Sequence, residues 1–188
     1  MTKNITESKI DASNDWRGFA EELKKESPRA AVILGASFLD IKLRELIASF
    51  LIDNRVVDSL LGGIDGGEAP LSTFSSRTKL AYCLGLLTKD EYDDLNMIRK
   101  IRNEFAHKLH NLSFDDQKVV EWCNSLKLPK YLGYGKMSHA ILFRVGVALL
   151  AAQLDMAAKK ALLNRLAVPG NNKWDERLKV VGVSLGTT

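Results

Sequence analysis

Apolar residues recur every three or four positions along most of this chain, which is the spacing of one face of an α-helix. The clearest case is a stripe in the segment that follows Pro28, formed by Leu39, Leu43, Leu46, Ile47 and Phe50. The charged residues Lys42, Arg44 and Glu45 lie off this stripe, as expected for a helix that packs one side against a core. The helical period dominates from one end of the chain to the other, so the pattern predicts an all-α fold.

Capping residues, glycines and prolines divide the pattern into six helices. The breaks fall at the pair Ser27-Pro28, in a segment with two glycine pairs between Asn54 and Phe74, at Gly85, and around Pro129. The expected helices run from Asp11 or Ser13 to Ser27, from Pro28 to Leu51, from Ser72 or Thr73 to Leu84, from Thr88 to about His110, from Ser113 to Leu126, and from Met137 to about Leu166.

These helices predict a single bundle domain over residues 13–168, with flexible tails at residues 1–12 and 169–188. Within the second tail, residues 178–185 have the composition of a short strand. An apolar fraction of 46% in 188 residues is enough for one compact core. The final helix is apolar on several sides, which favours a homodimer that covers its surplus surface. The residues that carry this expectation are Leu142, Val145, Leu149, Ala152 and Leu163.

Charge and hydropathy narrow the class of protein further. Lysine and arginine exceed acidic residues by 27 to 23, a formal charge of +4 that permits an anionic partner without requiring one. The N-terminus is polar and has no apolar segment typical of a signal peptide. The densest apolar stretch, residues 145–152, is far shorter than the roughly 20 residues of a membrane span. We therefore expect a cytoplasmic protein without membrane contact.

The helix predicted from Thr88 onward carries the strongest candidate site. On a helical wheel its basic and amide side chains fall within an arc of about 140°, whereas its apolar residues occupy the other side. Together with Arg77 of the preceding helix, this polar face supplies the candidate binding or interface residues Arg99, Arg102, Asn103, His107 and His110. Histidine can transfer protons near neutral pH and arginine can neutralise a phosphate, so the face suits either an interface or phosphodiester chemistry.

Metal and cofactor chemistry is not expected. Glu104 and His107 match the Glu-x-x-His pair of di-iron bundles, but such a site needs a second copy of the pair, and the sequence has none. His107 and His110 lack a neighbouring carboxylate that would complete a metal site. The glycine pairs near residue 65 are followed by no Gly-Lys-Ser/Thr, so they do not form a nucleotide-binding loop.

A helix-turn-helix would be the natural way for this chain to bind DNA, and Gly85 stands where the turn glycine of that motif belongs. The helix that follows it does not fit, because its first turns contain Asp90, Glu91, Asp93 and Asp94. Carboxylates at that end would repel DNA phosphates. We expect no sequence-specific DNA binding.

Two segments carry a family resemblance. Residues 75–87, Ser-Ser-Arg-Thr-Lys-Leu-Ala-Tyr-Cys-Leu-Gly-Leu-Leu, and residues 98–107, Ile-Arg-Lys-Ile-Arg-Asn-Glu-Phe-Ala-His, resemble the mannitol operon repressors, and the likeness extends back through residues 29–51. The resemblance implies an all-helical bacterial regulator of sugar-alcohol uptake genes. It implies no DNA-binding motif, which favours regulation through contacts with an unidentified protein partner and no enzymatic activity.

The spacing of Arg102 and His107 also resembles the signature of HEPN domains, helical dimers many of which are metal-independent ribonucleases. Carried over to this chain, Arg102 would stabilise a phosphate, Asn103 would support it, and His107 would act as general acid or base. Glu104 lies beside this set and would repel RNA phosphate. A HEPN-type endoribonuclease, with RNA as its partner, is therefore the alternative to the regulator.

Overall fold

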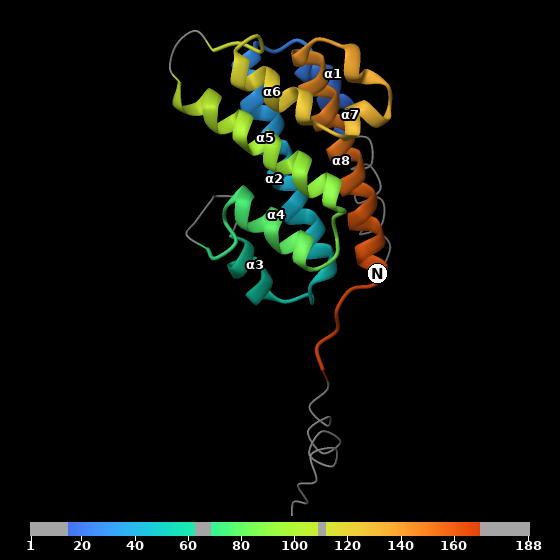
Figure 1. The fold of residues 1–188 in the computed structure, drawn as a ribbon. Coiled ribbons are helices and arrows are strands. Elements are labelled where there is room, and N and C mark those ends of the chain that lie inside the picture. The colour runs from blue at the N-terminus through green and yellow to red at the C-terminus, as the bar shows by residue number, and fades with distance from the viewer. Residues whose placement is uncertain (1–14, 63–68, 109–111, 170–188) are drawn as a thin grey trace, which may run out of the picture.

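The computed structural model of the chain describes residues 15–62, 69–108 and 112–169 (Figure 1). Helices account for most of these residues, and the described residues contain no strand, so the predicted all-α class is confirmed. The tail at 1–12, the strand-like segment 178–185 and His110 lie outside the described residues.

All six predicted helices are present, and two short ones add to them. The chain order is α1 (Asp15–Leu23), α2 (Pro28–Phe50), α3 (Arg55–Leu61), α4 (Phe74–Cys83), α5 (Lys89–His107), α6 (Gln117–Ser125), α7 (Leu128–Tyr131), a 3₁₀ turn (Tyr134–Lys136) and α8 (His139–Leu163).

The predicted count of six helices is too low because α3 and α7 are too short to show a helical period. Asn54 caps α3 by accepting a hydrogen bond from the amide of Val56, and two apolar side chains, Val57 and Leu61, anchor it in the core. Helix α7 has a proline, Pro129, in its first turn, where proline is tolerated because that amide needs no intrahelical acceptor. The sequence pattern predicts a break at this proline, and the structure has a short helix there.

Helices α2 and α8 lie side by side at the centre of the bundle and run in the same direction (Figure 1). Gly35 makes their close approach possible, since a Cβ atom there would lie 3.1 Å from a methyl group of Val147. At the C-terminal ends, the amide of Leu166 donates to the carbonyl of Phe50 at 2.8 Å. At the other end, Arg144 donates to the carbonyl oxygens of Leu23 and Glu26.

Helix α8 is long and apolar enough, by length and composition alone, to cross a membrane. A buried core helix has the same properties, and α8 packs against α1, α2, α6 and α7. The structure divides the residues that suggested a dimer. Leu142 belongs to the monomer core with 1% of its surface exposed, whereas Leu163 is 86% exposed.

Helices α4 and α5 both pack against α2 and against each other. Four apolar residues of α5 are fully buried, namely Leu95, Ile98, Ile101 and Phe105. Their spacing fixes the rotation of α5 about its own axis and turns its polar face toward α4 and the solvent.

Candidate functional site between helices α2, α4 and α5

Side-chain hydrogen bonds cap both ends of helix α5. At the start, Thr88 and Glu91 form a capping box, in which each side chain accepts a hydrogen bond from the backbone amide of the other. At the end, the guanidinium of Arg29 donates to the carbonyl oxygens of Phe105 and Lys108. Carbonyl groups at the C-terminal end of a helix receive no hydrogen bond from within the helix, so Arg29 supplies the missing donors. This second cap comes from α2, so it also ties the candidate site to the central helix pair.

The polar face of α5 opens into a pocket of about 520 Å³ between α2, α4 and α5. Three of the predicted site residues, Arg99, Arg102 and Asn103, line this pocket. Arg102 is exposed and donates from Nη1 to Oδ1 of Asn103 at 3.0 Å. The remaining lining residues come from α2 and from the start of α4: Ala36, Ser37, Asp40, Ile41, Ser72, Thr73, Phe74 and Ser75.

Arg77, the predicted site residue of α4, lies behind the pocket. It is 7% exposed and donates hydrogen bonds to the carbonyl oxygens of Leu61 at 2.7 Å and Leu71 at 2.8 Å. Its Nη1 forms an ion pair with Oδ2 of Asp40 at 2.8 Å. The guanidinium therefore holds α4, α2 and the segment around Leu71 together, and it compensates the charge of the carboxylate that faces the pocket.

Asp40 is the acidic residue of the pocket. Burial raises its pKa above the ordinary value, and the positive charges of Arg77 and Arg102 oppose that rise. Its other oxygen, Oδ1, is buried and has no hydrogen-bond partner among the described residues, and the same holds for Nε of Arg99. Buried polar atoms are normally paired, so the wall of this pocket contains two atoms whose hydrogen bonding the described chain does not complete.

His107 is the last residue of α5 and is exposed. It does not line the pocket, so the structure brings Arg99, Arg102 and Asn103 together and leaves His107 outside. The carboxylate of Glu104 forms an ion pair with Lys108, one turn later in the chain, at 3.0 Å. Among the residues that the structure describes, no group of His, Cys, Asp and Glu side chains could hold a metal ion.

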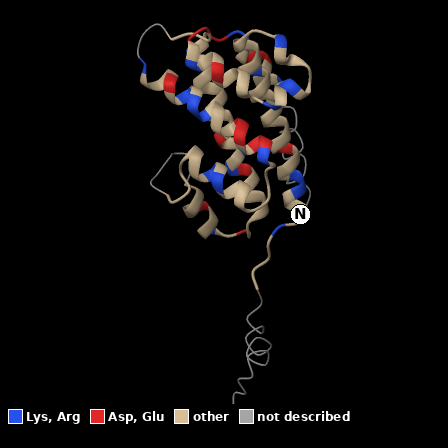
Figure 2. Ribbon diagram, viewed as in Figure 1, with Lys and Arg blue, Asp and Glu red and all other residues tan. Residues whose placement is uncertain are grey.

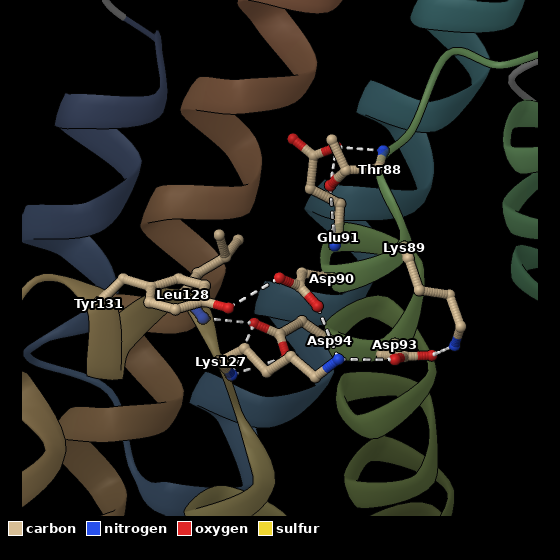
Figure 3. Close-up of polar contacts among 9 residues, drawn as sticks. All are labelled: Thr88, Lys89, Asp90, Glu91, Asp93, Asp94, Lys127, Leu128 and Tyr131. Carbon is tan, nitrogen blue, oxygen red and sulfur yellow. Dashed lines mark hydrogen bonds and ion pairs between the residues drawn. The ribbon is translucent and has the colours of Figure 1, made fainter.

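The acidic first turns of α5 contact helix α7 (Figure 3). Asp94 is fully buried and accepts hydrogen bonds from the backbone amides of Lys127 and Leu128 at 2.8–3.1 Å. The ammonium group of Lys127 lies 2.6 Å from Asp90 and 2.9 Å from Asp93. The hydroxyl of Tyr131 donates to Asp90. These carboxylates therefore connect two helices within the molecule.

Acidic residues gather in the first half of α5 and basic residues in its second half (Figure 2). Its first half carries Asp90, Glu91, Asp93 and Asp94, and its second half carries Arg99, Lys100 and Arg102. Lys127 compensates much of the negative half, whereas the guanidinium groups of the positive half face the pocket and the solvent.

The three aspartates of α5 that contact α7, Asp90, Asp93 and Asp94, should differ in pKa. Hydrogen bonds from Lys127 to Asp90, and from Lys89 and Lys127 to Asp93, lower both pKa values, whereas burial raises that of Asp94. Asp90 and Asp93 thus stabilise the fold above their ordinary pKa of 3.8, and this contribution is lost as the pH falls through their folded pKa values. The pH dependence contributed by Asp94 has the opposite sign. Its pKa is raised in the folded state, so its ionisation as the pH rises disfavours folding.

The measurement is an NMR titration of the side-chain carboxyl carbons. In a Lys127→Met variant, the pKa values of Asp90 and Asp93 should rise toward 3.8, and the backbone contacts of Asp94 should persist. Unchanged values for Asp90 and Asp93 would contradict the assigned cause.

Sequence reasoning missed the pocket residues that come from α2 and from the start of α4. Asp40 is the first acidic residue of α2 and interrupts an otherwise apolar run, which is the one signal that could have marked it. Ser37, Ser72 and Ser75 carry no such signal, because only the packing of three helices brings their hydroxyl groups to one pocket.

A solved structure shares this fold. The X-ray structure of the MtlR-HPr complex from Escherichia coli contains a chain that matches this one with a TM-score of 0.60, covering 74% of this chain and 97% of that chain. The identity is 19%, so this likeness defines the class of the protein as a helical bundle with the fold of that chain.

The sequence comparisons then establish the family. The mannitol repressor family, MtlR, matches residues 20–141, a segment that contains the whole pocket, and this chain belongs to that family. The resemblance inferred from residues 75–87 and 98–107 is thereby confirmed. The mannitol operon repressors of Escherichia coli strains K12 and O6:H1 are each 33% identical to it over 71 residues. Those matches span 38% of this chain and 36% of each relative.

Proposed function

We propose that this chain is a cytoplasmic transcription regulator of the mannitol operon repressor type, and that it acts by binding another protein, of the HPr type. Membership of the mannitol repressor family is the observation that carries the proposal. The choice of partner is supported by the solved structure with the same fold, which is a complex of MtlR with HPr.

The packing of α5 supports action without a DNA-reading helix. In a helix-turn-helix, the N-terminal residues of the second helix enter the major groove. Here the corresponding end of α5 packs against α7. Asp94 accepts hydrogen bonds from the backbone amides of Lys127 and Leu128, and Asp90 accepts one from the hydroxyl of Tyr131 (Figure 3). Entry of α5 into a groove would require these contacts to break.

The segment around α7 supplies the surface that we assign to the protein partner. Between α7 and the first turn of α8, five large apolar or aromatic side chains are exposed: Tyr131, Leu132, Tyr134, Met137 and Ile141. Tyrosine and methionine are enriched in protein interfaces, and the flanking Lys130 and Lys136 give the surface a basic rim.

A Leu132→Asp variant tests this assignment. Leu132 is 61% exposed, so the change should leave the fold intact, yet it would place a charge at the centre of the interface and weaken HPr binding by about 30-fold. Isothermal titration calorimetry with purified HPr measures the effect. Val56→Asp is the matched control, since Val56 is 67% exposed on α3 and lies outside the surface. Equal affinities for the two variants would reject the surface, and no binding by the unaltered protein would reject the partner.

Self-association is a further part of the proposal. The exposed end of α8, with Met156, Leu162 and Leu163, supports a homodimer in which two copies cover this apolar surface. The ribonuclease alternative gains no support from the pocket, because Arg102 and Asn103 line it whereas His107 lies outside.

A further inference from the structure

We propose that the pocket between α2, α4 and α5 binds a small phosphomonoester that also carries hydroxyl groups, of the sugar phosphate class. The pocket has a volume of about 520 Å³, which lies in the range of small-molecule sites. This proposal concerns a low-molecular-weight ligand and is independent of the protein partner.

The charges of the pocket select an anion. Arg99 and Arg102 reach it from α5, and the carboxylate of Asp40 is already compensated by Arg77 at 2.8 Å. The site therefore has a net positive charge before any ligand binds. Guanidinium groups donate several hydrogen bonds in a planar array that matches phosphate oxygens.

The start of helix α4 adds donors to the lining of the pocket. Its capping box uses the side chains of Thr73 and Ser76 and the amides of these two residues. Phe74 and Ser75, the first two residues of the helix, line the pocket, and amides at such positions have no acceptor within the helix. A pocket lined by both a helix N-terminus and two arginines is a favourable place for a phosphate group.

The unpaired polar atoms of the wall provide an independent observation. Nε of Arg99 and Oδ1 of Asp40 are buried without a hydrogen-bond partner among the described residues. Both residues line the pocket, so the side chains that flank it are only partly satisfied by the protein. Neither side chain therefore has all of its hydrogen-bonding capacity used within the described part of the protein.

The other lining groups indicate that the ligand is more than a phosphate ion. Hydroxyl groups of Ser37, Ser72, Thr73 and Ser75 surround the pocket, and Asp40 offers a carboxylate acceptor. Hydroxyl and carboxylate side chains pair well with the hydroxyl groups of a polyol or sugar. Phosphate at the arginines and hydroxyl groups toward Asp40 would satisfy both halves of the pocket.

The test is calorimetric titration of the full chain with four probes: glucose 6-phosphate, glycerol 3-phosphate, glucose and inorganic phosphate. We expect at least one phosphomonoester to bind at least about tenfold more tightly than inorganic phosphate, and glucose to bind more weakly still, since each added hydrogen bond contributes. No binding of either phosphomonoester at millimolar concentration, or equal binding of inorganic phosphate, would overturn the proposal.

Two matched variants locate the site. Arg102→Gln removes a pocket charge from an exposed position and should weaken binding by about tenfold or more, whereas Lys100→Gln removes the same charge from the same helix outside the pocket and should change it less than about twofold. Circular dichroism confirms that both variants fold. Equal loss in both variants, or displacement of the sugar phosphate by a short single-stranded RNA, would overturn the assignment. The isolated protein suffices for these measurements, so their failure would leave the partner proposal untouched.

Discussion

Replacement of Arg77 by alanine should destabilise the fold by about 2–4 kcal/mol, because it removes the donor of buried hydrogen bonds and leaves a partly buried charge without its ion-pair partner. The charge in question is that of Asp40, and the carbonyl oxygens of Leu61 and Leu71 would lose their donors as well. Urea-induced unfolding followed by circular dichroism measures the loss.

A neighbour on the same helix provides the control for Arg77. Lys79 is exposed on α4, so Lys79→Ala should change the free energy of unfolding by no more than about 0.5 kcal/mol. A second substitution tests the mechanism: adding Asp40→Asn to Arg77→Ala should recover part of the stability, because the unpaired charge is then absent. A loss below about 1 kcal/mol for Arg77→Ala would show that the guanidinium is not a structural connection.

The second large effect is expected at Asp94. Its carboxylate accepts hydrogen bonds from the backbone amides of Lys127 and Leu128. Asp94→Ala would leave these two partly buried donors without an acceptor. Hydrogen bonds to charged groups contribute about 1.5–3 kcal/mol each, and the unfavourable burial of the carboxylate offsets part of this, so a net loss of roughly 2–4 kcal/mol is expected. Thermal and urea unfolding measure it.

Two further variants separate the role of the acceptor from that of charge. Asp94→Asn keeps one side-chain oxygen and should lose about half as much stability as Asp94→Ala. Asp93→Ala removes a partly exposed acid from the same turn and should cost less than about 1 kcal/mol. If Asp93→Ala were as destabilising as Asp94→Ala, the stability would come from the negative charge at the start of α5. The hydrogen bonds that Asp94 accepts from Lys127 and Leu128 would then not be its source.

The sequence pattern was sufficient for the elements that are long and amphipathic. Lys42 is an exception, since the pattern places it off the stripe of α2 whereas it is only 4% exposed. The stripe itself, the capping residue Thr88 and the apolar side of α5 lie where their periods and caps predict, and Thr73 rather than Ser72 caps α4. These features depend on residues within a few positions of one another, so local rules determine them. The helix after Ser113 begins at Gln117, because Asp116 rather than Ser113 is its N-cap residue.

The site was only half predictable for the opposite reason. The arginines and the asparagine of α5 share a face that a helical wheel displays, whereas their placement around one pocket with Asp40 and the serines depends on how three helices pack. Arg77 illustrates the same limit. Its position on α4 marked it as a candidate, but only the tertiary structure places it behind the pocket, paired with Asp40.

The parallel pairing of α2 with α8 has a consequence for how the chain acquires its structure. These two helices form the centre of the bundle, yet the whole segment from α3 to the 3₁₀ turn separates them in the sequence. Contacts between distant segments require closure of a long loop, which slows folding relative to local helix pairs. During synthesis on the ribosome, α2 emerges long before α8, so the part of its apolar surface that packs against α8 stays uncovered until that helix is made, and the nascent chain is a natural client for chaperones.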